Sequence, residues 1–125
     1  KNIIYLGVLK GKELQNIYKQ CSAFVLPSLE EGLALVQSEA LNASLPLITT
    51  ENSGGEDLIT HGKEGYIVPP GDEEKLLNCF EKLSFNIQLR RKMRYAAHQN
   101  SLRNNNWEKS VENLILKLNQ IKNKK

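Results

Sequence analysis

Residues 23–50 read AFVLPSLEEGLALVQSEALNASLPLITT, and the order of patterns within this stretch decides the fold. Ala23–Leu26 is a continuous apolar run stopped by Pro27, which predicts a short buried strand. Leu33–Ala43 is predicted to form a helix, and Leu45–Thr50 a second buried strand. A helix between two fully apolar strands is typical of a parallel β-α-β unit.

The same alternation continues on both sides of this unit. Ile3–Leu6 is predicted to be a strand followed by a helix over Lys12–Cys21, whereas Glu56–Thr60 and Tyr66–Val68 are predicted to be a short helix and a fourth strand. Because every strand is continuously apolar, we expect an α/β fold with a doubly wound, Rossmann-like parallel sheet and flanking helices. Right-handed crossovers then place the loops after the strands at one edge of the sheet, where such folds bind ligands.

The pattern is helical only after Gly71, so we expect a helical C-terminus. Asp72 is predicted to cap the first of these helices. The apolar face of that helix is expected to comprise Leu76, Leu77, Phe80 and Leu83. A second helix is predicted over Ile87–Leu102 and a third over residues 106–125, within one domain that spans residues 1–125.

The composition is that of an ordinary globular domain. The chain has 125 residues, 40% hydrophobic and 25% charged, and no apolar run approaches the ~20 residues that a membrane span needs. The net charge of +3 arises from cations near the C-terminus: Arg90, Arg91, Lys92, Arg94, Arg103, Lys122, Lys124 and Lys125. Such a cluster predicts a solvated helix face, with acidic lipid headgroups or nucleic acid as the alternative contacts.

Metal and disulfide chemistry are not expected. The two cysteines, Cys21 and Cys79, lie among apolar neighbours in helix-like segments, which favours buried reduced thiols over a disulfide. The histidines His61 and His98 lack the spacing of zinc ligands, and no C-x-x-C pair is present. We therefore predict no metal and no cofactor, with both histidines at the surface or at a helix end.

An anion site is predicted where the strand over Ala23–Leu26 leads into the next helix. Gly32 allows a bound group to approach the backbone closely. The amides of Ala34, Leu35 and Val36 fall in the first helical turn, where N–H groups lack partners within the helix. Together with the helix dipole, these amides suit a diphosphate and require no lysine.

Two carboxylates flank this predicted anion site. Glu31 precedes the helix and Glu39 lies about two turns inside it, so the two are ~12 Å apart along the axis. That span is the reach from a sugar ring, across a diphosphate, to a ribose. A carboxylate can accept hydrogen bonds from both ribose hydroxyls, which suits Glu39, while Glu31 would hold sugar hydroxyls near the reacting carbon. Two glutamates alone would be ordinary surface residues, but their position at a strand end, beside a glycine and a helix start, favours a site.

The stretch PSLEEGLALVQSEAL, residues 27–41, resembles the E-x7-E signature of retaining glycosyltransferases with the GT-B fold, the glycosyl transferases group 1. YLGVLKGKELQNIYKQCSAFVLPS before it and ALNASLPLITTENSGGEDLITHGKEGYIVPPGDEEKL after it are similar to the family's motifs in the same order. The resemblance covers about residues 1–83. Leu33, Ala34 and Ser44 depart from the aromatic residue and the two glycines common in the family, which weakens any assignment of sugar or base.

The resemblance implies a role for each matching residue. Glu31 matches the glutamate that contacts the donor sugar near the reaction centre, and Glu39 the glutamate that binds the ribose. Gly32 and the amides near Leu35 and Val36 match the diphosphate-binding turn. Gly54 and Gly55 match a glycine pair in a nearby donor-binding loop, although a simple helix-start turn explains them equally well.

The implied function is that of the donor-binding domain of a glycosyltransferase, the C-terminal half of a GT-B fold without the start of that domain and without the acceptor domain. The parent enzyme would transfer a hexose-type sugar from a UDP- or GDP-sugar with retention, in surface polysaccharide or glycolipid synthesis. We expect a cytoplasmic protein, with peripheral contact at the inner face of the membrane as an open question. The isolated chain is expected to be inactive, and the apolar stripe after Trp107 to favour a homodimer.

Several alternatives of other classes are retained or disfavoured on the motifs. A non-catalytic nucleotide-binding or interaction domain would carry the same fold and remains open. Dinucleotide binding is disfavoured because Gly7 and Gly11 do not supply the G-x-G-x-x-G pattern, and a P-loop is absent. Glycoside hydrolysis by Glu31 and Glu39 is disfavoured because the pair would flank a helix-bound anion rather than a sugar cleft.

Overall fold

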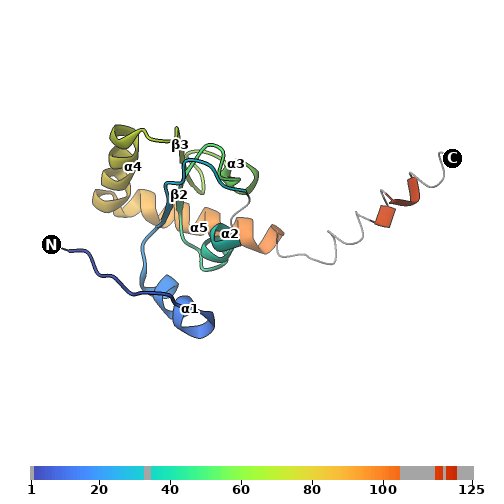
Figure 1. The fold of residues 1–125 in the computed structure, drawn as a ribbon, viewed down its shortest axis with the longest axis horizontal. Coiled ribbons are helices and arrows are strands. Elements are labelled where there is room, and N and C mark those ends of the chain that lie inside the picture. The colour runs from blue at the N-terminus through green and yellow to red at the C-terminus, as the bar shows by residue number, and fades with distance from the viewer. Residues whose placement is uncertain (1, 33–34, 105–114, 117, 121–125) are drawn as a thin grey trace.

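A computed structural model of the chain describes residues 2–32, 35–104, 115–116 and 118–120. The principal elements, in chain order, are α1 (Gly11–Gln20), β1 (Phe24–Leu26), α2 (Leu35–Asn42), β2 (Leu47–Thr50), α3 (Gly55–Leu58), β3 (Gly65–Val68), α4 (Glu73–Phe85) and α5 (Ile87–Asn104). The strands form a parallel sheet in the order β1-β2-β3, and the helices are arranged around it (Figure 1).

The central strand β2 is buried along its whole length, which confirms the prediction of a sheet covered on both faces. Its residue Ile48 pairs with Val25 of β1 and Tyr66 of β3. Successive side chains of a strand point to opposite faces, and Leu47 and Ile48 accordingly belong to two separate core clusters. The continuous apolar run therefore arises because helices cover both faces of the sheet.

Helices α1, α2 and α5 contribute to the first core cluster, and α4 and α5 to the second. The first holds Tyr18, Ala40, Leu41, Leu45, Leu47, Ile59 and Ala97. The second holds Ile48, Tyr66, Val68, Cys79, Leu83 and Met93. Helix α5 thus contacts both layers, Met93 packing in one cluster and Ala97 in the other.

The strand predicted over Ile3–Leu6 is wrong. These residues form no strand, and Ile3, Ile4 and Tyr5 are 91%, 81% and 92% exposed. A strand requires a neighbour that completes its hydrogen-bond ladder. No described strand lies beside this segment, which runs apart from the sheet at the blue end of the chain (Figure 1). The described sheet therefore has three strands where the sequence predicted four.

The predicted apolar face of α4 is correct in part. Leu76 packs against the core and Leu83 is buried, but Leu77 and Phe80 are 58% and 41% exposed. The helix instead presents Cys79, four residues before Leu83, to the second core cluster. Leu77 and Phe80 lie off this stripe, so their apolar character did not identify the buried face.

Both cysteines are free thiols, as predicted. Cys79 is buried, and the burial raises the pKa of its thiol. Cys21 is half-buried at the end of α1, where its carbonyl accepts a hydrogen bond from Arg94 Nη1 at 2.9 Å. Arg90 Nη1 similarly donates to the carbonyl of Leu83 at 2.6 Å. Two of the predicted solvated cations therefore satisfy helix-end carbonyls instead.

Asp72 caps α4 as predicted, since its carboxylate accepts a hydrogen bond from the backbone N–H of Lys75 at 3.0 Å. That N–H, followed by the Lys75 ammonium, lowers the pKa of Asp72 below its ordinary value. The residues after α5 are described only at 115–116 and 118–120, which are helical, so most of the helix predicted over residues 106–125 lies outside the described residues. Within the described part of the chain, no helix is long and apolar enough to cross a membrane.

Replacing Asp72 with alanine is expected to loosen the first turn of α4, because the amide of Lys75 then loses its acceptor. A lowered native pKa stabilises the fold above the ordinary pKa of an aspartate, and the contribution disappears as the pH falls through the lowered value. The protection factor of the Lys75 amide, which compares its exchange rate with the intrinsic rate at the same pH, should therefore fall in the variant and, on acidification, in the unmodified chain. Glu81→Ala, an exposed change further along α4, should leave that exchange unaltered.

Candidate active site

The loops that follow the three strands are joined by hydrogen bonds at the carboxyl edge of the sheet. The backbone N–H of Glu31, after β1, donates to the carbonyl of Asn52, after β2, at 3.0 Å. The hydroxyl of Thr50 donates to the carbonyl of Ser28. Glu51 N donates to the carbonyl of Val68, the last residue of β3, at 3.0 Å. This edge is the place where the sequence predicted a ligand site.

Glu31 is exposed at this edge, and its carboxylate is oriented by the chain itself. The hydroxyl of Ser28 donates to Glu31 Oε2 at 2.9 Å. The backbone N–H of Glu31 is bonded to Asn52 of the next loop, whereas its carboxylate is bonded to Ser28 of its own loop. An exposed carboxylate held in this way can accept hydrogen bonds from hydroxyl groups of a bound molecule.

The start of α2 lies between Glu31 and Glu39 in the chain. Leu35 and Val36, in its first turn, are exposed. A Cβ added at Gly32 would meet no atom within 4 Å, so the approach to this backbone is open. Ala34, the remaining predicted amide donor, lies outside the described residues. The described part of this turn is therefore accessible to an anion.

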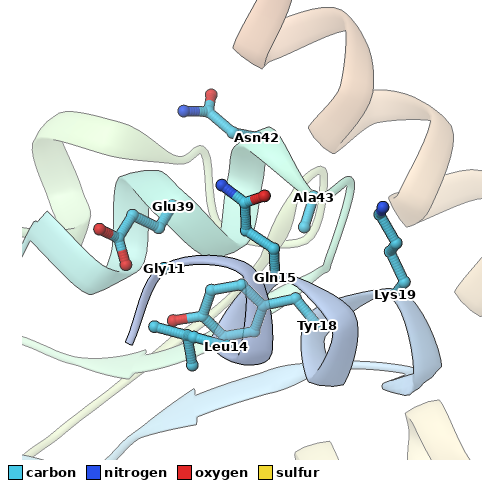
Figure 2. Close-up of a pocket in the computed structure, with 8 residues that line it drawn as sticks. All are labelled: Gly11, Leu14, Gln15, Tyr18, Lys19, Glu39, Asn42 and Ala43. Atoms are coloured by element: carbon cyan, nitrogen blue, oxygen red, sulfur yellow. The ribbon is translucent and has the colours of Figure 1, made fainter. Parts of the chain in front are cut away.

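Glu39 lines a groove between α1 and α2 (Figure 2). The groove has a volume of about 350 Å³ and is lined by Gly11, Leu14, Gln15, Tyr18, Lys19, Glu39, Asn42 and Ala43. The Glu39 carboxylate and the Tyr18 hydroxyl are on the same side of it (Figure 2). Burial, and then the negative charge of Glu39, raise the pKa of Tyr18 above its ordinary value.

The glycine pair shapes the loop after β2. Gly54 has a left-handed φ of +73° at the N-cap of α3, and Gly55 is the first residue of that short helix. A Cβ on Gly55 would overlap the Thr49 side chain and lie 3.2 Å from Gln37 Oε1. These observations agree with the helix-start interpretation of the pair. A contact of either glycine with a donor stays a prediction.

Sequence reasoning missed a buried polar network beneath this loop. Gln37, inside α2, donates through Nε2 to the carbonyl of Ser53 at 2.6 Å. The Ser53 hydroxyl donates to the carbonyl of Thr50 and shares a 2.6 Å hydrogen bond with the hydroxyl of Thr49. Gln37 Oε1 has no partner among the residues that the structure describes. The only signals in the sequence were a glutamine among apolar helix residues and the polar run TTENS.

The histidines lie at the surface, as predicted. His61 Nδ1 lies 3.0 Å from the carbonyl of Ile67, and His98 Nδ1 lies 3.2 Å from the hydroxyl of Ser44. Among the described residues, no group of three or more His, Cys, Asp or Glu side chains could hold a metal ion.

The family model described as glycosyl transferases group 1 matches residues 1–100. The chain belongs to this family. Similar relatives include sulfoquinovosyl transferase SQD2 of Arabidopsis thaliana, 37% identical over 64% of this chain and 16% of the relative. The capsular polysaccharide biosynthesis glycosyltransferase CapM of Staphylococcus aureus is 35% identical over 60% of this chain and 20% of the relative.

A third relative is UDP-Gal:alpha-D-GlcNAc-diphosphoundecaprenol alpha-1,3-galactosyltransferase of Escherichia coli, which is 31% identical over 67% of this chain and 21% of the relative. The chain therefore spans only 16% to 21% of the length of these three relatives. The activity, substrates and partners of the whole protein are accordingly matters of proposal.

Solved structures confirm the fold of this chain. Sucrose-phosphate synthase from Thermosynechococcus elongatus superposes with a TM-score of 0.74 at 22% identity, over 87% of this chain and 27% of that one. The C-terminal domain of a glycosyl transferase group 1 family protein, LpcC of Francisella tularensis, superposes with a TM-score of 0.69 at 22% identity, over 76% and 49%. The three-stranded sheet with its helices is thus a fragment of the GT-B fold.

Proposed function

We propose that the chain binds the donor of an enzyme that transfers a hexose-type sugar from a nucleotide diphosphate sugar to an acceptor, with retention at the anomeric carbon. The observation that carries the proposal is the arrangement around α2. Glu31 is held at the sheet edge by Ser28 and Asn52, the first turn of α2 is exposed, and Glu39 lines a groove with α1. The three features correspond to the sugar, the diphosphate and the nucleoside of one donor.

The nucleoside is proposed to occupy the groove between α1 and α2. A volume of about 350 Å³ is within the range of small-molecule sites. The Glu39 carboxylate would accept hydrogen bonds from the two ribose hydroxyls, which are charge-assisted and therefore strong. Leu14 and the ring of Tyr18 supply apolar surface for the base or the ribose.

The diphosphate is proposed to lie at the start of α2, against the amides of Leu35 and Val36 and, from the sequence, Ala34. Negative charge builds on the departing diphosphate as the bond to the sugar breaks. Oriented amides at a helix start stabilise this charge without a metal ion. Gly32 leaves the approach open, and Glu31 would hold sugar hydroxyls beside the reacting carbon. Gly54 and Gly55 would bring the next loop to the same donor.

The wider role is proposed from the relatives and from charge. The CapM relative is named for capsular polysaccharide biosynthesis, and the E. coli relative for a UDP-Gal donor and an acceptor on diphosphoundecaprenol. We propose a UDP- or GDP-sugar donor, a role in surface polysaccharide or glycolipid synthesis in the cytoplasm, and an acceptor domain outside this chain. Contact of the C-terminal cations with an anionic membrane and self-association are further proposals. A non-catalytic nucleotide-binding domain is the second candidate, which the open groove fits equally.

Replacing Glu39 with alanine should weaken the binding of a nucleotide diphosphate about tenfold to a hundredfold, because a charged hydrogen-bond acceptor for the ribose is lost. The measurement is the thermal shift and calorimetric Kd for UDP, GDP, ADP and CMP. Glu81→Ala, an exposed glutamate of another helix, is the matched control and should bind as the unmodified chain does. If the Glu39 variant binds these nucleotides with the same Kd as the unmodified chain, the proposal that the nucleoside occupies the groove is wrong.

A further inference from the structure

Gln37 has no direct route to a bound substrate. Its side chain is fully buried in α2, beneath the loop that follows β2. An amide in this position can influence a reaction only through the groups that it contacts. Its Nε2 donates to the carbonyl of Ser53 at 2.6 Å, which is a short hydrogen bond for a neutral amide.

A continuous path of contacts leads from Gln37 to Glu31. The carbonyl of Ser53 accepts from Gln37, and the preceding residue, Asn52, accepts at its own carbonyl from the backbone N–H of Glu31 at 3.0 Å. Asn52 has a left-handed φ of +64°, a turn conformation that asparagine adopts more readily than most residues with a side chain. Gln37 is one anchor of that loop, and the Ser53 hydroxyl, bonded at Thr49 and Thr50, is another.

The amide of Gln37 is not explained by core packing. Its Oε1 is buried without a partner among the described residues, and an unsatisfied buried acceptor destabilises the folded state. An apolar side chain of similar length would fill the same space without that cost. The group that distinguishes glutamine from such a side chain is the Nε2 donor, whose recipient is the loop that holds Glu31.

We infer that Gln37 is a positioning residue for the donor sugar: through Ser53 and Asn52 it holds the backbone of Glu31 where the carboxylate meets the sugar. The inference rests on the proposed function, because Glu31 must contact the sugar for its position to matter. The Ser28 hydroxyl orients the Glu31 carboxylate from the other side. Gln37 should therefore influence the binding of the donor's sugar. It should not influence the binding of the nucleotide in the groove that Glu39 lines.

The experiment compares the affinity for a nucleotide diphosphate with the affinity for the corresponding nucleotide sugar. UDP and GDP are titrated beside a panel of UDP- and GDP-hexoses, in the intact protein, by calorimetry. Glu31→Gln should weaken sugar-nucleotide binding and leave the diphosphate affinity unchanged. Gln37→Met, which keeps the length and removes the donor, should cause a smaller loss of the same kind, about threefold to tenfold. A general packing defect would weaken both ligands together.

A double-mutant cycle supplies the deciding comparison. If Gln37 acts through Glu31, Gln37→Met should cause no further loss in the Glu31→Gln background. Ser53→Ala, which removes the second anchor without altering α2, should reproduce the sugar-specific loss even if Gln37→Met folds poorly. Gln88→Met, at an exposed position of α5, should alter neither affinity.

The outcomes separate the two proposals. An equal loss from Gln37→Met in both backgrounds, or an equal loss for diphosphate and sugar nucleotide, overturns the positioning role and leaves the donor site standing. An unchanged sugar affinity in Glu31→Gln, or no binding of any nucleotide, overturns the proposed function and the positioning role with it.

Discussion

Alanine in place of Gly65 is expected to prevent the chain from folding. Gly65 opens β3 directly opposite Leu47 of the buried central strand β2. A Cβ at this position would overlap the carbonyl oxygen of Leu47 and lie 2.7 Å from its nitrogen. These are backbone atoms of a strand paired on both sides, so they cannot move aside as a flexible side chain would. We expect a loss of more than about 4 kcal/mol, a large part of the stability of a small domain.

The measurement is denaturant or thermal unfolding followed by circular dichroism. Gly32→Ala is the matched control, because a Cβ there meets nothing within 4 Å and the backbone is not in the left-handed region. That variant should unfold close to the unmodified chain. A Gly65 variant whose midpoint falls by only a few degrees would show that the two strands can separate, and would contradict the close approach.

The sequence predicted β2 and its neighbours well because their environment leaves little choice. Leu47–Thr50 is buried on both faces, and a short run of apolar and β-branched residues bounded by turn residues is typical of such a strand. The fourth strand was predicted to begin at Tyr66, whereas the structure begins β3 one residue earlier, at Gly65. Its role depends on how closely β2 approaches, and no local pattern contains that distance.

Ile3–Leu6 is as apolar as the real strands and yet exposed. An apolar pattern indicates that a segment can be buried. Whether the segment forms a strand depends also on a neighbouring strand with which it can form hydrogen bonds. The same reasoning applies to α4, where Leu77 and Phe80 are apolar and lie outside the core. Which stripe of a helix is buried depends on where the sheet lies relative to it.

The candidate site was predictable in its exposed parts and not in its buried ones. Glu31 and Glu39 were identified because carboxylates at a strand end and two helical turns later suit a known kind of ligand. Their placement on different surfaces, one at the sheet edge and one in the α1–α2 groove, came from the structure. Gln37 and Ser53 were missed because a glutamine within a helix resembles a surface residue until its burial is known.

Replacing Glu31 with glutamine is expected to lower the kcat of sugar transfer in the intact protein about 10²- to 10³-fold, as the loss of one preorganised polar group at a reaction centre does. Glutamine keeps the shape and can still accept the Ser28 hydroxyl, but it removes the charge next to the reacting sugar. Affinity for the free nucleotide diphosphate should stay unchanged, because Glu39 lines the separate groove. The measurement is the rate of donor consumption at saturating donor, together with the Kd for UDP and GDP.

The chain offers a close control in the neighbouring glutamate. Glu30 is also exposed and carries the same charge, so Glu30→Gln alters the local potential by the same amount. Only Glu31, however, receives the Ser28 hydroxyl and has its backbone N–H bonded to Asn52. If orientation and not general charge determines the rate, Glu30→Gln should retain most of the activity. The activity of Ser28→Ala should then lie between those of Glu30→Gln and Glu31→Gln. This substitution leaves the Glu31 charge in place and removes one hydrogen bond that orients the carboxylate. If Glu30→Gln and Glu31→Gln lower the rate of sugar transfer by similar factors, the rate depends on the total negative charge of the loop. The position of the Glu31 carboxylate is then not decisive.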